Sequence, residues 1–422
     1  MSKRPEAVSF LGKQLFTYLA RAGLDTTALD AQVAEAEKAV EVSDSPSARA
    51  ALVDALRGAG KYRMAVARAT VGLAKWPDDA LLLTERGHTY VNMRAVTAAL
   101  ADLSKAVRLA PHSFDAWYHY ALSLWFSTSF AEAAEAFDKA AEVTKSDSSR
   151  LAAQTWQYTA LRRSGNEPLA RALLPTIRWD VDLEGKNLNY QLRARFYQGG
   201  LTEQDLVNSQ APGTKSEGSL SFGLGIWHLA NGNVETARRH FEVGAASEFW
   251  PAFGVAACEL ELAILDGLEL PEPETTGVLG DPLYALVSHG EQAAELSTKV
   301  ATALAAHKAD PDDVDKIRVY AKALASGLAR YRAANAVLEA ALERFPDHPL
   351  LLCDRGHYFV NMRQFDLAKA DLERAKVLAP ESSDVWYHLA LSHWMLGEFA
   401  DALSAFQRAL ALADNESHTV AY

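Results

Sequence analysis

The chain has 422 residues, a formal net charge of −12 and a pI near 5.5. This acidic balance argues against a nucleic-acid-binding surface, which needs a clustered excess of Lys and Arg. The two cysteines, Cys258 and Cys353, are too few for a disulfide framework and lack the paired spacing of a zinc site. A chain of this length normally divides into several domains, but a repeat array is also compatible because each repeat packs only on its neighbours.

The N-terminus begins with basic residues, but Lys13 interrupts its apolar run and no small-residue cleavage site follows. A secretory signal is therefore not predicted. No stretch approaches the roughly eighteen apolar residues of a membrane span. We expect a soluble, cytoplasmic protein whose partners are neither membranes nor nucleic acid.

One long segment occurs twice in the chain. Residues 77–140 align without a gap on residues 346–409, at a constant offset of 269 (346 − 77). The sequence RGHTYVNMR at 86–94 returns as RGHYFVNMR at 355–363, and AWYHYALSLW at 116–125 returns as VWYHLALSHW at 385–394. Within each copy two prolines lie 34 residues apart, at Pro77 and Pro111 and at Pro346 and Pro380. A fixed period of this length predicts stacked helical hairpins.

Residues 80–113 show how one hairpin is encoded. Leu83, Gly87 and Tyr90 fall at spacings of four and three, so they share one face of a first helix. Ala99 starts the matching face of a second helix, which Pro111 ends. Gly87 and Ala99 are small because the two helices approach closely there. The same template fits residues 114–145, 349–382 and 383–414.

These four units resemble the tetratricopeptide repeat, in which large apolar residues, a Gly or Ala, a Tyr, further Ala and Phe positions and a terminal Pro recur over 34 residues. The order of motifs over most of residues 77–265 is similar to that of a group of bacterial tetratricopeptide proteins of similar length. The resemblance implies an all-α fold, a right-handed solenoid of about 11 to 12 helical hairpins. It implies no reaction.

We expect three parts in the chain. Residues 1–267 form an N-terminal solenoid whose repeats become degenerate after about residue 150. Residues 268–283 contain three prolines and two glycines and have the composition of a loop or linker. Residues 284–422 form a C-terminal segment that duplicates the 62–140 module.

The first helices of such repeats line a concave groove, which is the predicted ligand-binding surface. Aromatic rings there supply buried area, and amide side chains bond to the backbone of a peptide. Packing against neighbouring helices is the alternative role of these residues, and for Trp125 and Trp394 the two roles are equally open. The predicted groove residues are Arg86, His88, Asn92, Tyr118, Leu122 and Trp125 in the first copy, and His357, Asn361, Tyr387 and Trp394 in the second.

The resemblance also argues against one class of ligand, a peptide held by its C-terminal carboxylate. Peptide-binding members of the family often hold a C-terminal carboxylate with Lys, Arg and Asn in the groove. Here His88 and His357 stand where such a clamp has an Asn, and the accompanying Lys is missing. An acidic C-terminal tail is not the expected ligand.

Arg86 and Arg355 stand where the repeat normally has a Leu between its helices. A guanidinium in the interior needs a carboxylate partner, so we predict an internal ion pair in each copy. The alternative is an anion held jointly by Arg86 and His88. The candidate partners are Asp102 and Asp371, or Asp115 and Asp384, at matching positions of the copies.

Catalytic, metal and cofactor sites are not predicted. His119 and His388 lie about one turn from Ser123 and Ser392, but no oxyanion feature or third group accompanies them. The histidines are scattered, and neither a Gly-rich phosphate loop nor a zincin motif is present.

We therefore predict a scaffold or adaptor that binds a protein or peptide. An enzyme with a small-molecule pocket inside the superhelix is the alternative, and the duplicated module also suggests a self-assembling homo-oligomer. The offset corresponds to 7.9 repeats (269/34), about one superhelical turn, which would place the copies on the same side. A changed curvature in the degenerate middle would instead make them face each other.

Overall fold

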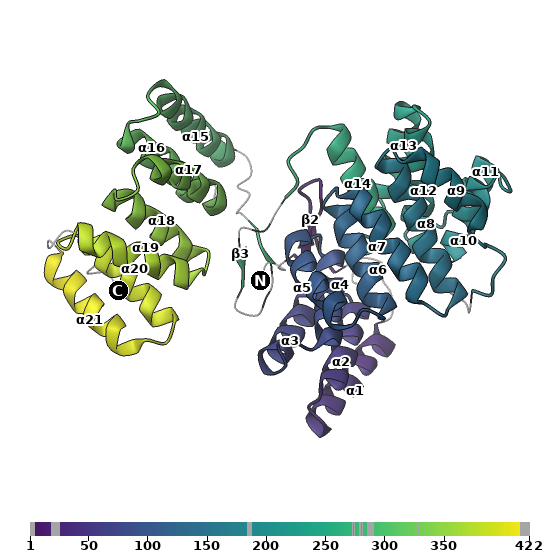
Figure 1. Cartoon of the computed structure of the whole chain (residues 1–422), viewed down its shortest axis with the longest axis horizontal. Coiled ribbons are helices and arrows are strands. Elements are labelled where there is room, and N and C mark those ends of the chain that lie inside the picture. The colour runs from purple at the N-terminus through teal and green to yellow at the C-terminus, as the bar shows by residue number, and fades with distance from the viewer. Residues whose placement is uncertain are drawn as a thin grey trace. The chain divides into compact units, whose positions relative to one another are not determined.

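Figure 1 shows the computed structural model of the chain, in which helices dominate. The structure describes residues 5–17, 26–183, 188–271, 273, 275–277, 280, 282–284, 291–327 and 330–413. These residues contain 21 α-helices, close to the 22 to 24 of eleven to twelve hairpins, so the all-α prediction is confirmed. The chain forms two compact units, residues 1–272 with 278–281 and residues 273–277 with 282–422.

The first unit begins with a short antiparallel ribbon, in which β1 (Ala7–Val8) pairs with β2 (Gln14–Leu15). Helices then follow one another as antiparallel neighbours. They are α1 (Thr27–Val42), α2 (Pro46–Gly58), α3 (Tyr62–Lys75), α4 (Ala80–Asn92), α5 (Val96–Leu109), α6 (Phe114–Phe126), α7 (Phe130–Val143), α8 (Asp147–Arg163), α9 (Glu167–Leu173), the 3₁₀ helix η2 (Leu174–Thr176), α10 (Leu188–Tyr197), α11 (Glu203–Asn208), α12 (Lys215–Ala230), α13 (Val234–Ala245) and α14 (Phe253–Leu265).

The second unit contains a second short ribbon and the remaining helices. Strands β3 (Thr275–Thr276) and β4 (Pro282–Leu283) pair within the stretch predicted to be a loop or linker. The helices are α15 (Glu291–Ala309), α16 (Val314–Lys322), the π-helical turn η3 (Ala323–Gly327), α17 (Tyr331–Arg344), α18 (Pro349–Asn361), α19 (Phe365–Leu378), α20 (Ser383–Met395) and α21 (Phe399–Leu412).

Local sequence signals explain where the hairpin helices start and how closely they pack. Asp79 caps α4 by accepting from the backbone N–H of Leu82 at 2.8 Å, and Ser113 caps α6 in the same way. Gly87 lies against α5 so closely that a Cβ there would come within 2.5 Å of the Leu103 side chain. The close approach predicted from the small residue at position 87 is thus confirmed.

Each unit has its own apolar core. The core of the first unit runs from Phe10 through Trp125 and Trp156 to Phe222 and the helix α14. The principal core of the second unit extends from Ile317 in α16 to Leu389 in α20. Across the described residues, every helix is too short or too polar to cross a membrane.

Candidate functional site

The duplicated segment folds into the same four helices in both units. We call α4 to α7 the first module and α18 to α21 the second module. Even an unusual backbone feature is repeated: Arg94 and Arg363, in the turns after α4 and α18, have φ of 61° and 60°. Non-glycine residues rarely adopt this left-handed conformation. The side chains of the two modules can therefore be compared position by position.

The interior ion pair predicted for each copy is confirmed. Arg86 Nε and Nη2 donate to the two carboxylate oxygens of Asp102 at 2.7 and 2.8 Å. Arg355 makes the same two bonds to Asp371, also at 2.7 and 2.8 Å. Such a two-point contact fixes the guanidinium in one orientation and connects the two helices of the hairpin. Because of these bonds, the Arg86 side chain packs within the repeat.

Each of the predicted groove histidines, His88 and His357, stacks on a second histidine of its module. The rings of His88 and His119 lie 3.7 Å apart, and those of His357 and His388 lie 4.1 Å apart. Burial lowers the pKa of both His119 and His388 to about 3, so both imidazoles are neutral near pH 7.

The serines near these histidines bond elsewhere. Ser123 Oγ donates to the Tyr120 carbonyl at 2.7 Å, and Ser392 Oγ donates to the His388 carbonyl at 3.0 Å. In each module the serine hydroxyl is thus directed at the backbone. A nucleophilic serine needs a hydrogen bond to its base, so this geometry gives no support to catalysis through these pairs.

The groove face of the first module is covered by the same unit's own chain. Asn92 Nδ2 donates to the Pro251 carbonyl at 2.9 Å. Arg94, which is 1% exposed, donates to both carboxylate oxygens of Glu259 in α14 and to the Trp250 carbonyl at 2.6 Å. The N-terminal segment joins this contact, because the Phe10 backbone N–H donates to Glu259 at 3.3 Å.

Aromatic contacts complete this covered face. Phe253, at the start of α14, lies 5.7 Å from the His88 ring and 5.9 Å from the His119 ring. Phe10 packs on Phe126 at 5.6 Å between ring centroids. The first module is therefore in contact with a Trp-Pro segment, a helix with an acidic side chain, and an apolar residue from the turn between β1 and β2.

The remaining predicted residues of the first module lie inside the array. Trp125 is fully buried, with its ring 5.4 Å from Trp156 and 5.6 Å from Phe222. Leu122 is also fully buried, and the Tyr118 hydroxyl lies 2.9 Å from that of Tyr190. For Trp125 the structure thus favours the packing role over the groove role.

In the part of the chain that the structure describes, the equivalent face of the second module is left uncovered at several positions. Asn361 and Arg363, the counterparts of Asn92 and Arg94, are exposed. Trp394 is 55% exposed, whereas its counterpart Trp125 is fully buried. His357 and Tyr387 are half-buried, and the large apolar side chains of Met395 and Phe399 add to the exposed surface. Three matching side chains, those of Asn, Arg and Trp, are thus buried in the first copy and exposed in the second.

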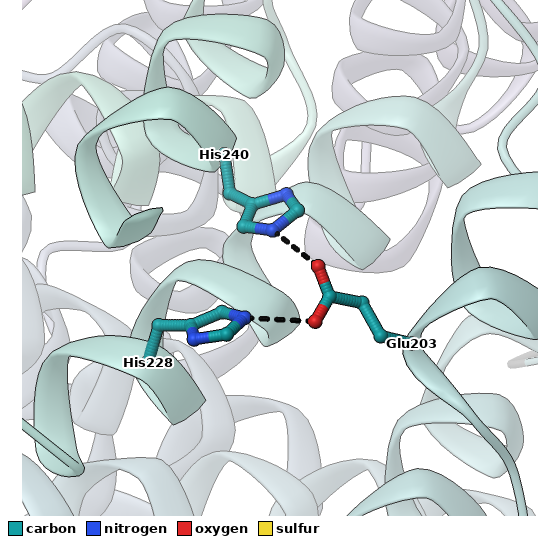
Figure 2. Close-up of side chains that lie close together, drawn as sticks. All are labelled: Glu203, His228 and His240. Atoms are coloured by element: carbon teal, nitrogen blue, oxygen red, sulfur yellow. Dashed lines mark hydrogen bonds and ion pairs between the residues drawn. The ribbon is translucent and has the colours of Figure 1, made fainter. Parts of the chain in front are cut away.

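A second cluster of chemically active side chains lies on the later helices of the first unit, and it was missed by the sequence analysis. His228 Nε2 and His240 Nε2 each lie 3.0 Å from an oxygen of Glu203, as Figure 2 shows. The three residues come from α12, α13 and α11. The only sequence signal is a pair of histidines twelve residues apart across the turn at Gly232, and the glutamate lies 25 residues before the first of them.

A family model described as a tetratricopeptide repeat matches residues 84–150 and 353–417, which include most of the two modules. The fold is an α-solenoid of helical hairpins, and these two matched segments are its tetratricopeptide repeats. A tetratricopeptide repeat protein from Parabacteroides merdae is 17% identical, with 57% of this chain and 97% of that chain covered and a TM-score of 0.37. The APC/C hetero-tetramer Cut9–Hcn1 is 13% identical over 96% of this chain and 97% of that chain, with a TM-score of 0.27.

The human IFIT1 dimer with m7Gppp-AAAA is also similar, at 14% identity over 94% of this chain and 79% of that chain, with a TM-score of 0.31. No curated protein matches the chain. Similarities this distant identify no ligand for this chain.

Proposed function

We propose that this tetratricopeptide-repeat solenoid is a protein-binding scaffold whose second module takes a helical segment of a partner protein. The observation that carries the proposal is the contrast between the modules: Asn92 and Arg94 hold a segment of their own unit, while Asn361 and Arg363 are exposed. Since the two sets of residues match in type and in backbone conformation, the chain itself provides a template for the missing partner.

The covered module defines the chemistry of that partner. Arg94 pairs with a carboxylate carried by a helix, and Asn92 bonds to a carbonyl just before that helix. The expected partner segment is therefore a short turn with an aromatic residue, followed by a helix with an acidic side chain about two turns in. The exposed Trp394, Met395 and Phe399 supply the apolar area, because aromatic and flexible apolar side chains dominate the energy of such contacts.

The other predictions concern catalysis, the location of the protein, the parts of the chain and self-association. The enzyme alternative gains no support from the described residues, since Ser123 and Ser392 donate to backbone carbonyls and Arg86 is held by Asp102. A cytoplasmic location and the predicted parts 1–267, 268–283 and 284–422 remain proposals. Self-association through the open face of the second module is an outcome that the binding test can detect.

The test uses the full chain and a fluorescent peptide with the sequence of residues 249–265, the segment bound by the first module. Because that module is already covered, we expect saturable anisotropy binding at the second module. Arg363→Ala should weaken it about tenfold or more, as expected for a charge-assisted contact. Replacing Glu259 of the peptide by glutamine should have a similar effect, while the same change at Glu261 should not.

Arg374→Ala is the matched control, because it removes an exposed arginine of α19 that pairs with Asp347. It should leave the affinity unchanged. Absence of peptide binding, or equal loss in both variants, would contradict the proposal. Concentration-dependent mass in light scattering without peptide binding would replace it with self-assembly.

A further inference from the structure

The cluster of Glu203, His228 and His240 has the composition of a metal site. Its three ligand atoms all lie within 4.8 Å of one another, and both imidazole Nε2 atoms point at the same carboxylate (Figure 2). We propose that this cluster binds one divalent transition-metal ion of the zinc type. The proposal is independent of the binding face on the second module.

The distances suit such an ion with little rearrangement. Zinc binds imidazole nitrogen and carboxylate oxygen at about 2.0 to 2.2 Å, which sets neighbouring ligand atoms roughly 3 to 3.5 Å apart. The two Nε2 to oxygen separations are both 3.0 Å. The imidazole rings stand nearly parallel, with centroids 5.4 Å apart, so a small inward tilt brings the nitrogens around one ion.

Charge also favours an ion at this place. Among the described residues, the carboxylate of Glu203 is paired with the two imidazoles, and no Lys or Arg forms an ion pair with it. An arriving cation would therefore not have to displace a fixed positive charge.

A second group of similar composition, His393 with Glu398 and Asp401, serves as a comparison. There the Lys369 ammonium lies 2.7 Å from both oxygens of Glu398. The carboxylate already has a cation, and a metal ion would have to displace it. The described structure therefore favours the cluster at Glu203 over this one.

The elements around the cluster hold it in place and leave it accessible. A capping box between Thr202 and Asp205 fixes the backbone at the start of α11, where Glu203 lies. The Glu203 side chain is 42% exposed, so an ion can enter from solvent. Three protein ligands leave at least one coordination position for water or for a side chain of a bound protein. A bound ion would connect α11 to the α12–α13 hairpin.

The test is a Co²⁺ titration of the full chain after treatment with a chelator, followed by competition with Zn²⁺. We expect one ion per chain, visible absorption bands and a raised melting temperature of the first unit. Glu203→Gln, which can still accept a hydrogen bond, and His240→Gln should each weaken Co²⁺ binding by about 100-fold or more, since a direct ligand matters at least as much as its supporting residues.

His393→Gln is the control and should leave Co²⁺ binding unchanged. Circular dichroism of each variant shows whether the helices are retained. Absence of stoichiometric binding in the folded wild-type chain overturns the proposal. So does binding that survives in Glu203→Gln and His240→Gln, or binding that is lost only in His393→Gln.

Discussion

Replacing Arg94 by alanine should destabilise the first unit strongly, while the same change at Arg363 should have almost no effect. Arg94 makes bonds of 3.1 and 3.2 Å to Glu259, of 2.6 Å to the Trp250 carbonyl and of 2.5 Å to the Asn92 carbonyl. Glu259 is 3% exposed and would keep only a 3.3 Å bond from the backbone. Breaking a buried ion pair by removing one partner costs about 3 to 5 kcal/mol.

Arg363 is the matching residue of the second module, so a comparison of the two variants separates the effect of the surroundings from the effect of the residue type. Arg363 has the same backbone conformation as Arg94, and both arginine and alanine carry a Cβ, so the strain of the positive φ does not change in either variant. Because Arg363 is exposed, its replacement should change the free energy of unfolding by at most about 0.5 kcal/mol. The difference between the two variants is therefore the contribution of the buried contact.

Calorimetry can follow this difference, with tryptophan fluorescence to assign the transition of the unit that contains Trp250. With about 2 to 4 °C per kcal/mol for a large domain, Arg94→Ala should lower the melting temperature of that unit by roughly 6 to 20 °C. Replacing both Arg94 and Glu259 by methionine should recover much of the loss, since no buried charge is left unpaired. Equal shifts for the two single variants would refute the reasoning.

Three further predictions concern the shared features of the modules. Gly87→Ala should lower the free energy of unfolding, measured in urea, by about 1 to 3 kcal/mol, because a Cβ there would lie 2.5 Å from a leucine of α5. The control Gly58→Ala, with open space around it, should be neutral or stabilising, and equal effects of the two variants would contradict the prediction. Burial lowers the pKa of His119 to about 3, so below pH 6.5 the unfolded chain binds a proton that the folded chain does not. Stability should therefore fall by about 1.4 kcal/mol per pH unit, or about 2 kcal/mol between pH 6.5 and 5, and this slope should decrease in His119→Gln; an unchanged slope would argue against it. Asp102→Leu should lower the free energy of unfolding by about 3 kcal/mol, because it leaves the Arg86 charge without its carboxylate. The double variant Arg86→Leu with Asp102→Leu should fold with near wild-type stability. A double variant that folds normally but loses binding of an anion such as phosphate would support the anion-site alternative.

The sequence predicted the features that repeat locally. A 34-residue period, small residues at close approaches and an arginine in place of leucine led to the hairpins and to the pairs of Arg86 with Asp102 and Arg355 with Asp371. Both partners of each pair lie within one hairpin, 16 residues apart, so the repeat template alone fixes their separation. Features of this kind can be found in a single sequence.

The cover over the first module could not be predicted in this way. Its contacts join Asn92 to a carbonyl 159 residues later, and Phe10 to a carboxylate 249 residues later. Such pairs depend on the curvature accumulated over the intervening helices, and no periodic pattern records it. The cluster at Glu203 was missed for the same reason, because its glutamate lies on a six-residue helix outside the repeat pattern.

The two modules together show that a single repeat sequence can be buried in one place and exposed in another. A side chain such as Arg94 or Arg363 is set on its helix hairpin by local packing, which the duplicated sequence preserves in both places. Whether it is then buried depends on what the rest of the chain brings to that face. In the first module that is α14 and the Phe10 segment, which convert the face into core. An exposed copy of the same face retains the donors and the aromatic surface but lacks the carboxylate and the apolar cover, and a partner that supplies both would bury it in the same way.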